Sequence, residues 1–201
     1  MAEITSDMVK KLRDATQAGM MDCKRALVET EGDFELAKDY LRKKGILKAD
    51  KVSGRETGEG IVYSYIHHNG KLGVLLELNC VTDFVARTED FKELAHRISL
   101  QLAAMGARYI SREHVPAEKI AKEKEIYAEQ VKDSGKPAHI VEKIVESKLE
   151  SFFKDNCLVE QEYVFESGKT VNDLIVELIA KTGENIKINR FVRWQIGESD
   201  N

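Results

Sequence analysis

The sequence predicts an α+β protein in which a small helical head precedes an antiparallel sheet of at least three strands backed by helices. Three observations lead to this class. Short helical stripes separated by glycines fill residues 1–45, and an alternating hairpin begins at residue 61. Two charged helical stretches then interrupt the sheet pattern at 111–157. At 201 residues the chain has room for one to three compact modules.

The head is expected to contain three short helices. Ser6 can cap the first, Asp22 the second and Asp33 the third, and a glycine ends each helix, the last at Gly45. The apolar stripes are Met8, Val9, Leu12 and Ala15, then Cys23, Ala26 and Leu27, then Phe34, Ala37, Tyr40 and Leu41. A bundle this small has few core residues and is expected to be marginally stable alone.

A linker is expected at 46–60, which begins as a continuation of helix and becomes rich in glycine and charge. The hairpin follows, with Asn69-Gly70 as its turn. Its return strand alternates Leu72, Val74, Leu76 and Leu78, so one face of the sheet is expected to be buried.

The remaining elements complete the core around an insertion. Residues 61–110 form its first part, which closes with a helix from Phe91 to Gly106, and residues 158–197 form its second part. The second part holds a strand at 163–165, a helix capped by Thr170, and a last strand at 186–195; residues 198–201 are a loose tail.

Residues 111–157 read as a projecting helical hairpin. The stretches 116–132 and 137–154 have sparse, heptad-like apolar positions and are joined by a tight turn at 133–136.

Composition narrows the function classes. The 31 basic and 35 acidic residues leave a net charge of −4. This argues against a protein whose main function is to bind nucleic acid by neutralising its phosphates. Three cysteines without a CxxC pair indicate a reducing compartment. The first residues lack a signal-peptide core, and no stretch approaches the ~18 apolar residues of a membrane span. We expect a cytoplasmic protein, or one in an organelle matrix, with no membrane contact.

Motifs for enzymatic chemistry are missing from the sequence. It contains no GxxxxGK[ST], no GxGxxG after a strand and no HExxH, so no cofactor or metal site is predicted. His67 and His68 read as a solvated hairpin tip. A thiol enzyme using Cys23 or Cys80 is one alternative, and it would require a histidine that lowers the thiol pKa.

Two stretches stand out from a purely structural reading. Met20-Met21 lies in a loop, where it either forms an adaptable contact surface or tucks under the bundle. The stretch LNCVTDFVAR (78–87) follows the return strand. There Thr82 or Asp83 can cap a helical turn, and Phe84 either packs as a staple or is held out for a partner.

Three blocks resemble the elongation factor Ts family. They are LRDATQAGMMDCKRAL (12–27), ELNCVTDFVAR (77–87) and IAKTGENI (179–186), and they lie in the family's order across nearly the whole chain. The resemblance implies a nucleotide exchange factor for the GTPase elongation factor Tu, with a head that resembles a ubiquitin-associated fold and a hairpin similar to the family's coiled-coil projection. Such a factor performs no bond chemistry of its own.

The resemblance also implies roles for particular residues. Thr82, Asp83, Phe84 and Val85 would intrude beside the partner's nucleotide and dislodge its Mg²⁺. The other expected contacts with the partner are Leu12, Met20, Met21 and Lys24 in the head, and Thr182 and Gly183 near the last strand.

Three departures from the family pattern are visible. Gln17 stands where glycine is usual, and Val81 stands where an acidic residue is common. The chain resembles the short form of the family, with one copy of the core subdomain, and short forms are expected to pair as homodimers.

Other function classes stay open on sequence grounds. The first is a binding module that tethers a partner without exchange activity. RNA binding through Lys187, Arg190 and Arg193 would need a steep salt dependence to support it.

Overall fold

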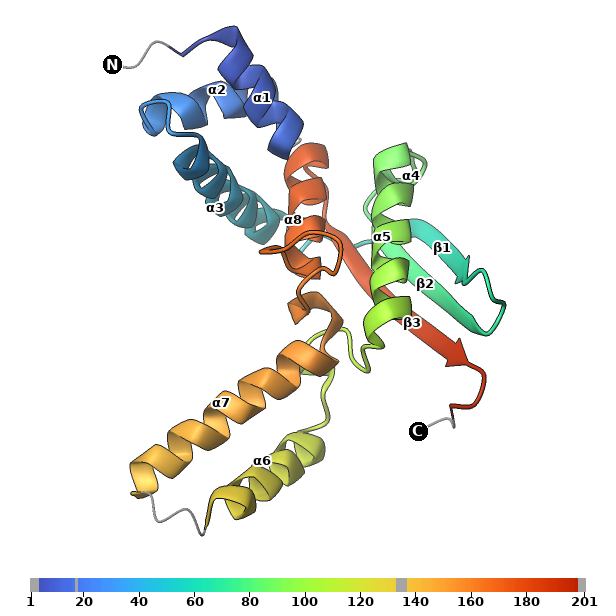
Figure 1. Cartoon of the computed structure of the whole chain (residues 1–201). Helices are drawn as coiled ribbons and strands as arrows, with labels where there is room; N and C mark the ends of the chain where they lie inside the picture. The colour runs from blue at the N-terminus through green and yellow to red at the C-terminus, as the bar shows by residue number, and fades with distance from the viewer. Residues whose placement is uncertain (1–3, 17, 133–136, 199–201) are drawn as a thin grey trace. The chain divides into compact units, whose positions relative to one another are not determined.

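This computed structural model describes residues 4–16, 18–132 and 137–198. These residues contain eight α-helices and three β-strands, joined by turns and loops (Figure 1). The α+β class is confirmed. The chain forms two compact units, Met1–Ser99 with Asn172–Asn201, and Leu100–Val171.

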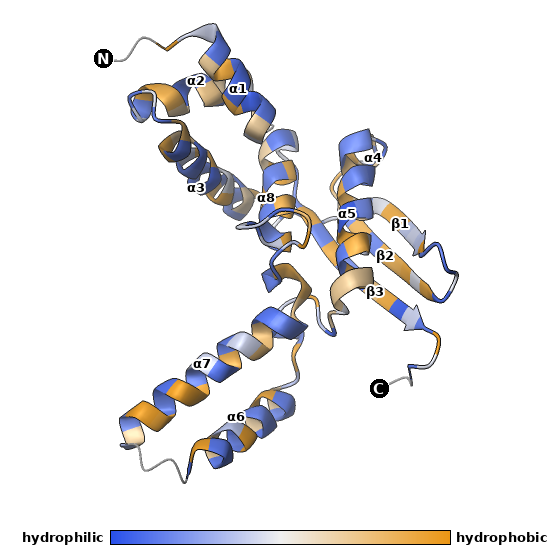
Figure 2. Ribbon diagram, in the orientation of Figure 1, coloured by the Kyte–Doolittle hydropathy of each residue, from blue (hydrophilic) through white to orange (hydrophobic). Residues whose placement is uncertain are grey.

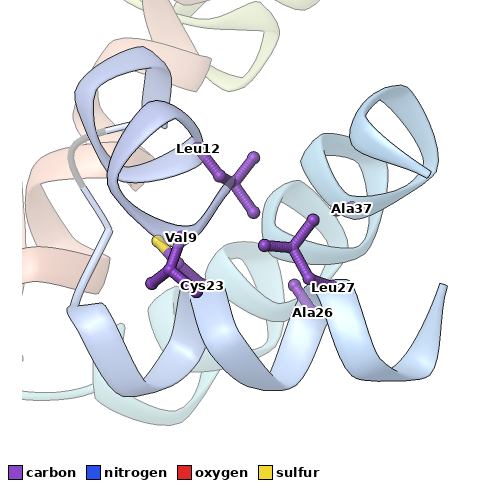
Figure 3. Close-up of a cluster of buried hydrophobic side chains, with 6 residues drawn as sticks. All are labelled: Val9, Leu12, Cys23, Ala26, Leu27 and Ala37. Atoms are coloured by element: carbon purple, nitrogen blue, oxygen red, sulfur yellow. The ribbon is translucent and has the colours of Figure 1, made fainter. Parts of the chain in front are cut away.

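The head consists of α1 (Ser6–Thr16), α2 (Met20–Glu29) and α3 (Phe34–Val52). Its buried side chains come from all three helices and point toward one another (Figure 3); they are Val9, Leu12, Cys23, Ala26, Leu27 and Ala37. Partly buried residues, among them Met8, Phe34 and Tyr40, pack around them. The predicted stripes therefore form the core of the head, except for Ala15, which is exposed.

One of the three predicted caps of the head is confirmed. The Asp33 carboxylate accepts a hydrogen bond from the Leu36 amide at 2.9 Å and begins α3. Ser6 lies inside α1, and Thr5 takes its place by accepting from the Met8 amide at 3.3 Å. Gly19 precedes α2, so Asp22 lies within the first turn of that helix, where the helix dipole favours an acid.

Asp22 joins two helices of the head. Its carboxylate oxygens lie 2.6 Å from Lys44 Nζ and 3.1 Å from Lys48 Nζ, both on α3. The hydrogen bond from Lys44 lowers the pKa of Asp22 below its ordinary value of 3.8, against the opposing effect of burial. Asp22 therefore stabilises the packing of α2 on α3.

The third helix does not end at Gly45 as predicted. It continues to Val52, and Gly45 is buried. A Cβ at residue 45 would lie 3.3 Å from Val176 Cγ1 and 3.6 Å from Ala180 Cβ, so the glycine allows α3 to approach α8 (Val171–Thr182) closely. Packing against a helix far along the chain, rather than local propensity, carries α3 past the glycine.

The sheet has the order β1-β2-β3 and is antiparallel throughout, with β1 at Glu59–Ile66, β2 at Leu72–Cys80 and β3 at Ile186–Gln195. The predicted Asn69-Gly70 turn is confirmed: the Gly70 amide donates to the His67 carbonyl at 2.8 Å, and Gly70 has a φ of 68°. A bulge in the β2–β3 pairing lies at Glu77/Leu78.

The two faces of the sheet differ. Helix α5 (Glu89–Met105) lies over one face (Figure 1), where Tyr63 Oη and His96 Nδ1 are 3.0 Å apart and Val74, Leu76 and Leu78 are buried. Figure 2 shows that hydrophobic residues recur along all three strands. Those on the other face are exposed; they are Val62, Ile66, Leu75 and Trp194.

The second unit contains the helices of the predicted hairpin, α6 (Ala117–Lys132) and α7 (Ala138–Asn156). Near its base, Arg112 bonds to Glu150 and Glu160 and lies over the Phe153 ring, 4.8 Å from its centroid. The buried side chains here are Val115, Leu149, Phe152, Phe153 and Cys157. The turn predicted at 133–136 lies outside the described residues.

The predicted strand at 163–165 is wrong. Only an isolated bridge joins Glu162 to Thr170, and the chain turns between them. The Val164 amide, which a neighbouring strand would bind, donates instead to the side-chain oxygen of Gln101 at 3.0 Å. A short apolar run resembles a strand in the sequence, but here the side chain of a buried glutamine provides the hydrogen bond that a neighbouring strand would otherwise provide.

Among the helices of the described chain, none combines the length and the apolar character needed to cross a membrane.

We predict that Asp22→Asn lowers the free energy of unfolding by about 1 kcal/mol at pH 7, because it weakens two partly buried ion pairs. A lowered folded-state pKa stabilises the protein above the ordinary pKa, and this stabilisation is lost as the pH falls through the folded value. Urea unfolding followed by circular dichroism should therefore show a difference between variant and wild type at pH 7 that shrinks toward pH 3.

The control is Asp39→Asn on the exposed side of α3, which should change little at either pH. An equal loss of stability for Asp22→Asn at both pH values would contradict the role of its charge.

Candidate functional site

The corner after β2 is a short helical turn with a threonine cap. Thr82 has extended backbone angles (φ −124°, ψ 152°), and its hydroxyl oxygen accepts from the Val85 amide at 3.4 Å. Helix α4 (Asp83–Ala86) follows at once. Of the two predicted caps, Thr82 is therefore the one used. We call residues 82–87 the Phe84 turn.

Phe84 points away from the protein. Its exposed fraction is 80%, whereas the neighbouring Ala86 is buried and Val85 is half-buried. The interpretation of Phe84 as a packed staple is wrong. A large aromatic ring exposed on a capped turn is accessible to a partner, and aromatic side chains are frequent energetic centres of interfaces.

The acid of the turn is held by a neighbour on the same turn. Asp83 Oδ2 lies 2.9 Å from Arg87 NH2, and both side chains are partly exposed. An exposed pair at this spacing contributes little to stability, so Asp83 remains available to a partner.

A residue far along the chain fixes the start of the Phe84 turn. The Thr82 amide donates to Glu184 Oε2 at 3.0 Å, and the Thr82 hydroxyl donates to Glu184 Oε1 at 2.7 Å. The Cys80 thiol donates to the Thr82 carbonyl at 3.1 Å. Sequence reasoning included Glu184 in a family block but gave it no role, because its partner lies 102 positions away.

Thr182 and Gly183, the predicted further contacts, directly precede Glu184. The Thr182 hydroxyl donates to the Leu178 carbonyl at 2.9 Å and accepts from the Glu184 amide at 3.3 Å. Gly183 has a φ of 74°, and its amide donates to the Ile179 carbonyl, which ends α8. Both residues thus direct Glu184 toward Thr82, and Gly183 is also exposed.

The predicted head residues separate into two groups. Met20, Met21 and Lys24 are exposed on α2, where Met20 and Met21 have exposed fractions of 48% and 70%. Val28, exposed one turn further along α2, extends this apolar surface. Leu12, in contrast, is fully buried in the core of the head and is not available to a partner, which corrects its expected role. Gln17 lies outside the described residues.

The cysteines do not support thiol chemistry. Cys23, Cys80 and Cys157 are free and buried, and burial raises the pKa of both Cys80 and Cys157 to about 11. Burial also raises the pKa of Cys23. A buried thiol with a raised pKa is a poor nucleophile at neutral pH. Within the described residues, no group of three side chains is arranged to hold a metal ion.

Several known proteins similar to this chain are named elongation factor Ts. The sequence model of the family described as elongation factor TS matches residues 46–198. Elongation factor Ts of Fervidobacterium nodosum is 63% identical over 196 residues, which cover 98% of this chain and 100% of that protein. The proteins of that name from Thermosipho melanesiensis and Coprothermobacter proteolyticus are 60% and 56% identical, and 97% and 98% of this chain and all of each relative are covered.

We predict that Thr82→Val lowers the free energy of unfolding by about 1–3 kcal/mol, because it removes one donor to Glu184 and the cap of the Val85 amide without changing the side-chain shape. Thr82→Ser keeps the hydroxyl and should retain most of the stability. Chemical unfolding of the full chain measures both variants. Equal losses for valine and serine would mean that the hydroxyl bonds are not what holds the turn.

Proposed function

The chain belongs to the elongation factor Ts family, and we propose that it acts as a guanine nucleotide exchange factor on elongation factor Tu. Its family gives it a role in translation elongation. In the proposed reaction it binds the GDP-bound GTPase, disturbs the Mg²⁺ site of that partner and promotes GDP release, so that GTP can bind. The observation that supports this most directly is Phe84, 80% exposed on a turn that is fixed at its start.

A rigid projecting ring suits the disturbance of a metal site. A GTPase holds its nucleotide through backbone N–H groups, a lysine and Mg²⁺ that bridges the phosphates. Mg²⁺ requires nearly ideal octahedral geometry, so a small displacement of its ligands sharply weakens the binding of the ion. In this proposal Phe84 enters the partner beside the nucleotide, with Asp83, Thr82 and Val85 forming the rest of the intruding segment.

Phe84 cannot supply the whole effect. Burying its ring in a partner returns roughly 1.5–3 kcal/mol. A 10⁴-fold bias between two states of the partner needs about 5.5 kcal/mol. The remainder must come from other contacts. We assign these to the exposed α2 surface formed by Met20, Met21 and Lys24, and to the region of Thr182 and Gly183.

Linkage determines how the factor leaves its partner. If the factor weakens nucleotide binding, then nucleotide weakens binding of the factor by the same ratio. Either nucleotide therefore displaces the factor, and exchange needs no bond chemistry and no cofactor in this chain. We place this activity in the cytoplasm, where translation takes place.

A second copy of this chain is the proposed occupant of the open sheet face. Two rows of paired residues cross the three strands and point to this same open face. They are Ile66, Gly73 and Trp194, and Ser64, Leu75 and Val192. In the first row, Ile66 and Trp194 are exposed and provide a large apolar surface. Two such faces can pack together as a sandwich, which is consistent with the homodimer expected of a short form.

RNA binding has little support from two of the three cationic side chains named for it on β3, Arg190 and Arg193; Lys187 is the third. Arg190 Nε lies 2.6 Å from Glu77 Oε2, and Arg193 NH1 lies 2.6 Å from Glu198 Oε2. These charges are already neutralised by neighbouring acids.

We predict that Phe84→Ala slows GDP release from elongation factor Tu by about tenfold or more, which is the effect of losing most of the ring's buried surface. The variant should unfold at the same denaturant concentration as wild type because the ring is exposed. Release of fluorescent GDP at saturating factor is the measurement. Phe165→Ala removes another exposed phenylalanine, in the second unit, and should leave release unchanged.

Release by Phe84→Ala at the wild-type rate would refute the role of the ring. If the wild-type chain retains the GTPase in a pull-down but does not accelerate release, the chain is a tethering module without exchange activity.

We predict that the double variant Ile66→Lys, Trp194→Lys sediments as a monomer at micromolar concentrations at which wild type sediments as a dimer. Two charges in the centre of an apolar interface would have to be buried without partners. Met21→Lys changes an exposed apolar residue of the head and should stay dimeric. A dimeric double variant would place the interface elsewhere.

A further inference from the structure

We infer that Glu184 is a positioning residue for the Phe84 turn, an inference that rests on the proposed exchange function. Its carboxylate receives both donors of Thr82, the amide at 3.0 Å and the hydroxyl at 2.7 Å. Thr82 precedes Phe84 by two residues, so Glu184 acts on the direction of the ring rather than on the partner.

The position of Glu184 is itself fixed on both sides. Before it, Thr182 accepts the Glu184 amide, and Gly183 turns the chain out of α8. After it, the buried Asn185 donates through Nδ2 to the Ser53 carbonyl at 3.0 Å and to the Arg55 carbonyl at 2.8 Å. The carboxylate is therefore presented from an immobilised segment of backbone, as a pre-organised site requires.

The polar groups of Thr82 are all engaged. Its amide and hydroxyl donate to Glu184, its hydroxyl oxygen accepts from the Val85 amide, and its carbonyl accepts from the Cys80 thiol and the Ala86 amide. Removing the carboxylate of Glu184 leaves two donors of this cap without their partner. Among the described residues, Glu184 is the one acceptor bonded to these two donors.

A four-residue helix cannot maintain its own orientation, because forming a single turn is unfavourable without outside contacts. The direction of α4 therefore depends on contacts outside the helix, which are its packing on β1 and β2 through the buried Ala86 and the Thr82 cap at its start. The cap is the contact that lies next to Phe84. Loosening the cap lets Phe84 sample many directions while the rest of the fold stays formed, and the partner must then select the productive one.

The first test measures GDP release from elongation factor Tu at increasing concentrations of the full chain. Glu184→Ala should reduce the maximal release rate by about tenfold, the effect of losing a charge-assisted bond. Glu184→Gln can accept the Thr82 amide through its oxygen and donate to the Thr82 hydroxyl oxygen, so it should stay within about threefold of wild type. The control is Glu93→Ala on the exposed side of α5, which should leave the rate unchanged.

A double variant separates positioning from general stability. If Glu184 acts only through the ring, Phe84→Ala combined with Glu184→Ala should release GDP no more slowly than Phe84→Ala alone. Effects that multiply, or an equal loss for the glutamine and alanine variants, would overturn the inference.

The second test does not depend on the partner. Hydrogen exchange measured by NMR should be faster at the Thr82 and Val85 amides in Glu184→Ala than in wild type or Glu93→Ala. Unchanged protection of these two amides would overturn the inference. If Phe84→Ala leaves GDP release unaffected, the proposed function fails, and the amide exchange still decides whether Glu184 positions the turn.

Discussion

Two hydrogen bonds from Thr82 to the Glu184 carboxylate hold together the part of this protein on which its proposed function depends. They join the end of β2 to the link between α8 and β3, which lies 102 residues away in the sequence. A bond to a charged acceptor is stronger than one between neutral groups, and here one carboxylate satisfies both donors of the same residue. The same region connects to the head through Asn185, which binds the carbonyls of Ser53 and Arg55 just beyond α3. The corner is thus fixed by parts of the chain that do not neighbour it in sequence.

An exposed phenylalanine is useful to an exchange factor only if its direction is defined. The Phe84 turn is fixed at its start by Thr82, and it continues directly into α5, where Thr88 accepts the amide of the buried Phe91 at 3.3 Å. The turn therefore has a fixed residue on each side, and the ring between them faces solvent. Ordering a side chain on binding costs roughly 0.5–1.5 kcal/mol, and a ring that is already directed avoids part of this cost.

The sequence alone predicted the features that local chemistry determines. The Asp33 cap, the Asn69-Gly70 turn and the alternation along β2 each depend on residues within a few positions of one another, and all three are confirmed. Features that depend on distant partners were missed. The end of α3 is set by its packing on α8 through Gly45, and the apparent strand at 163–165 is prevented by the Gln101 side chain. The role of Glu184 has the same origin, since no spacing rule connects it to Thr82. For Leu12 the two lines of sequence evidence disagreed. Helical periodicity placed it in the core stripe, where it is buried, whereas the family block assigned it to the partner contact together with the exposed Met20.

The saturated bonding of the corner also constrains the mechanism. A factor that changed shape on binding would need an element with two arrangements of similar energy. The polar groups of Thr82 are all bonded and Ala86 is buried, so the described corner offers no second arrangement of that kind. At this contact the conformational change of the proposed reaction is therefore expected in the GTPase, with the corner acting as a rigid template for its nucleotide-free state. In this proposal reciprocal linkage arises from the two states of the partner: nucleotide and Mg²⁺ stabilise the state to which the projecting ring is not complementary, and the factor dissociates.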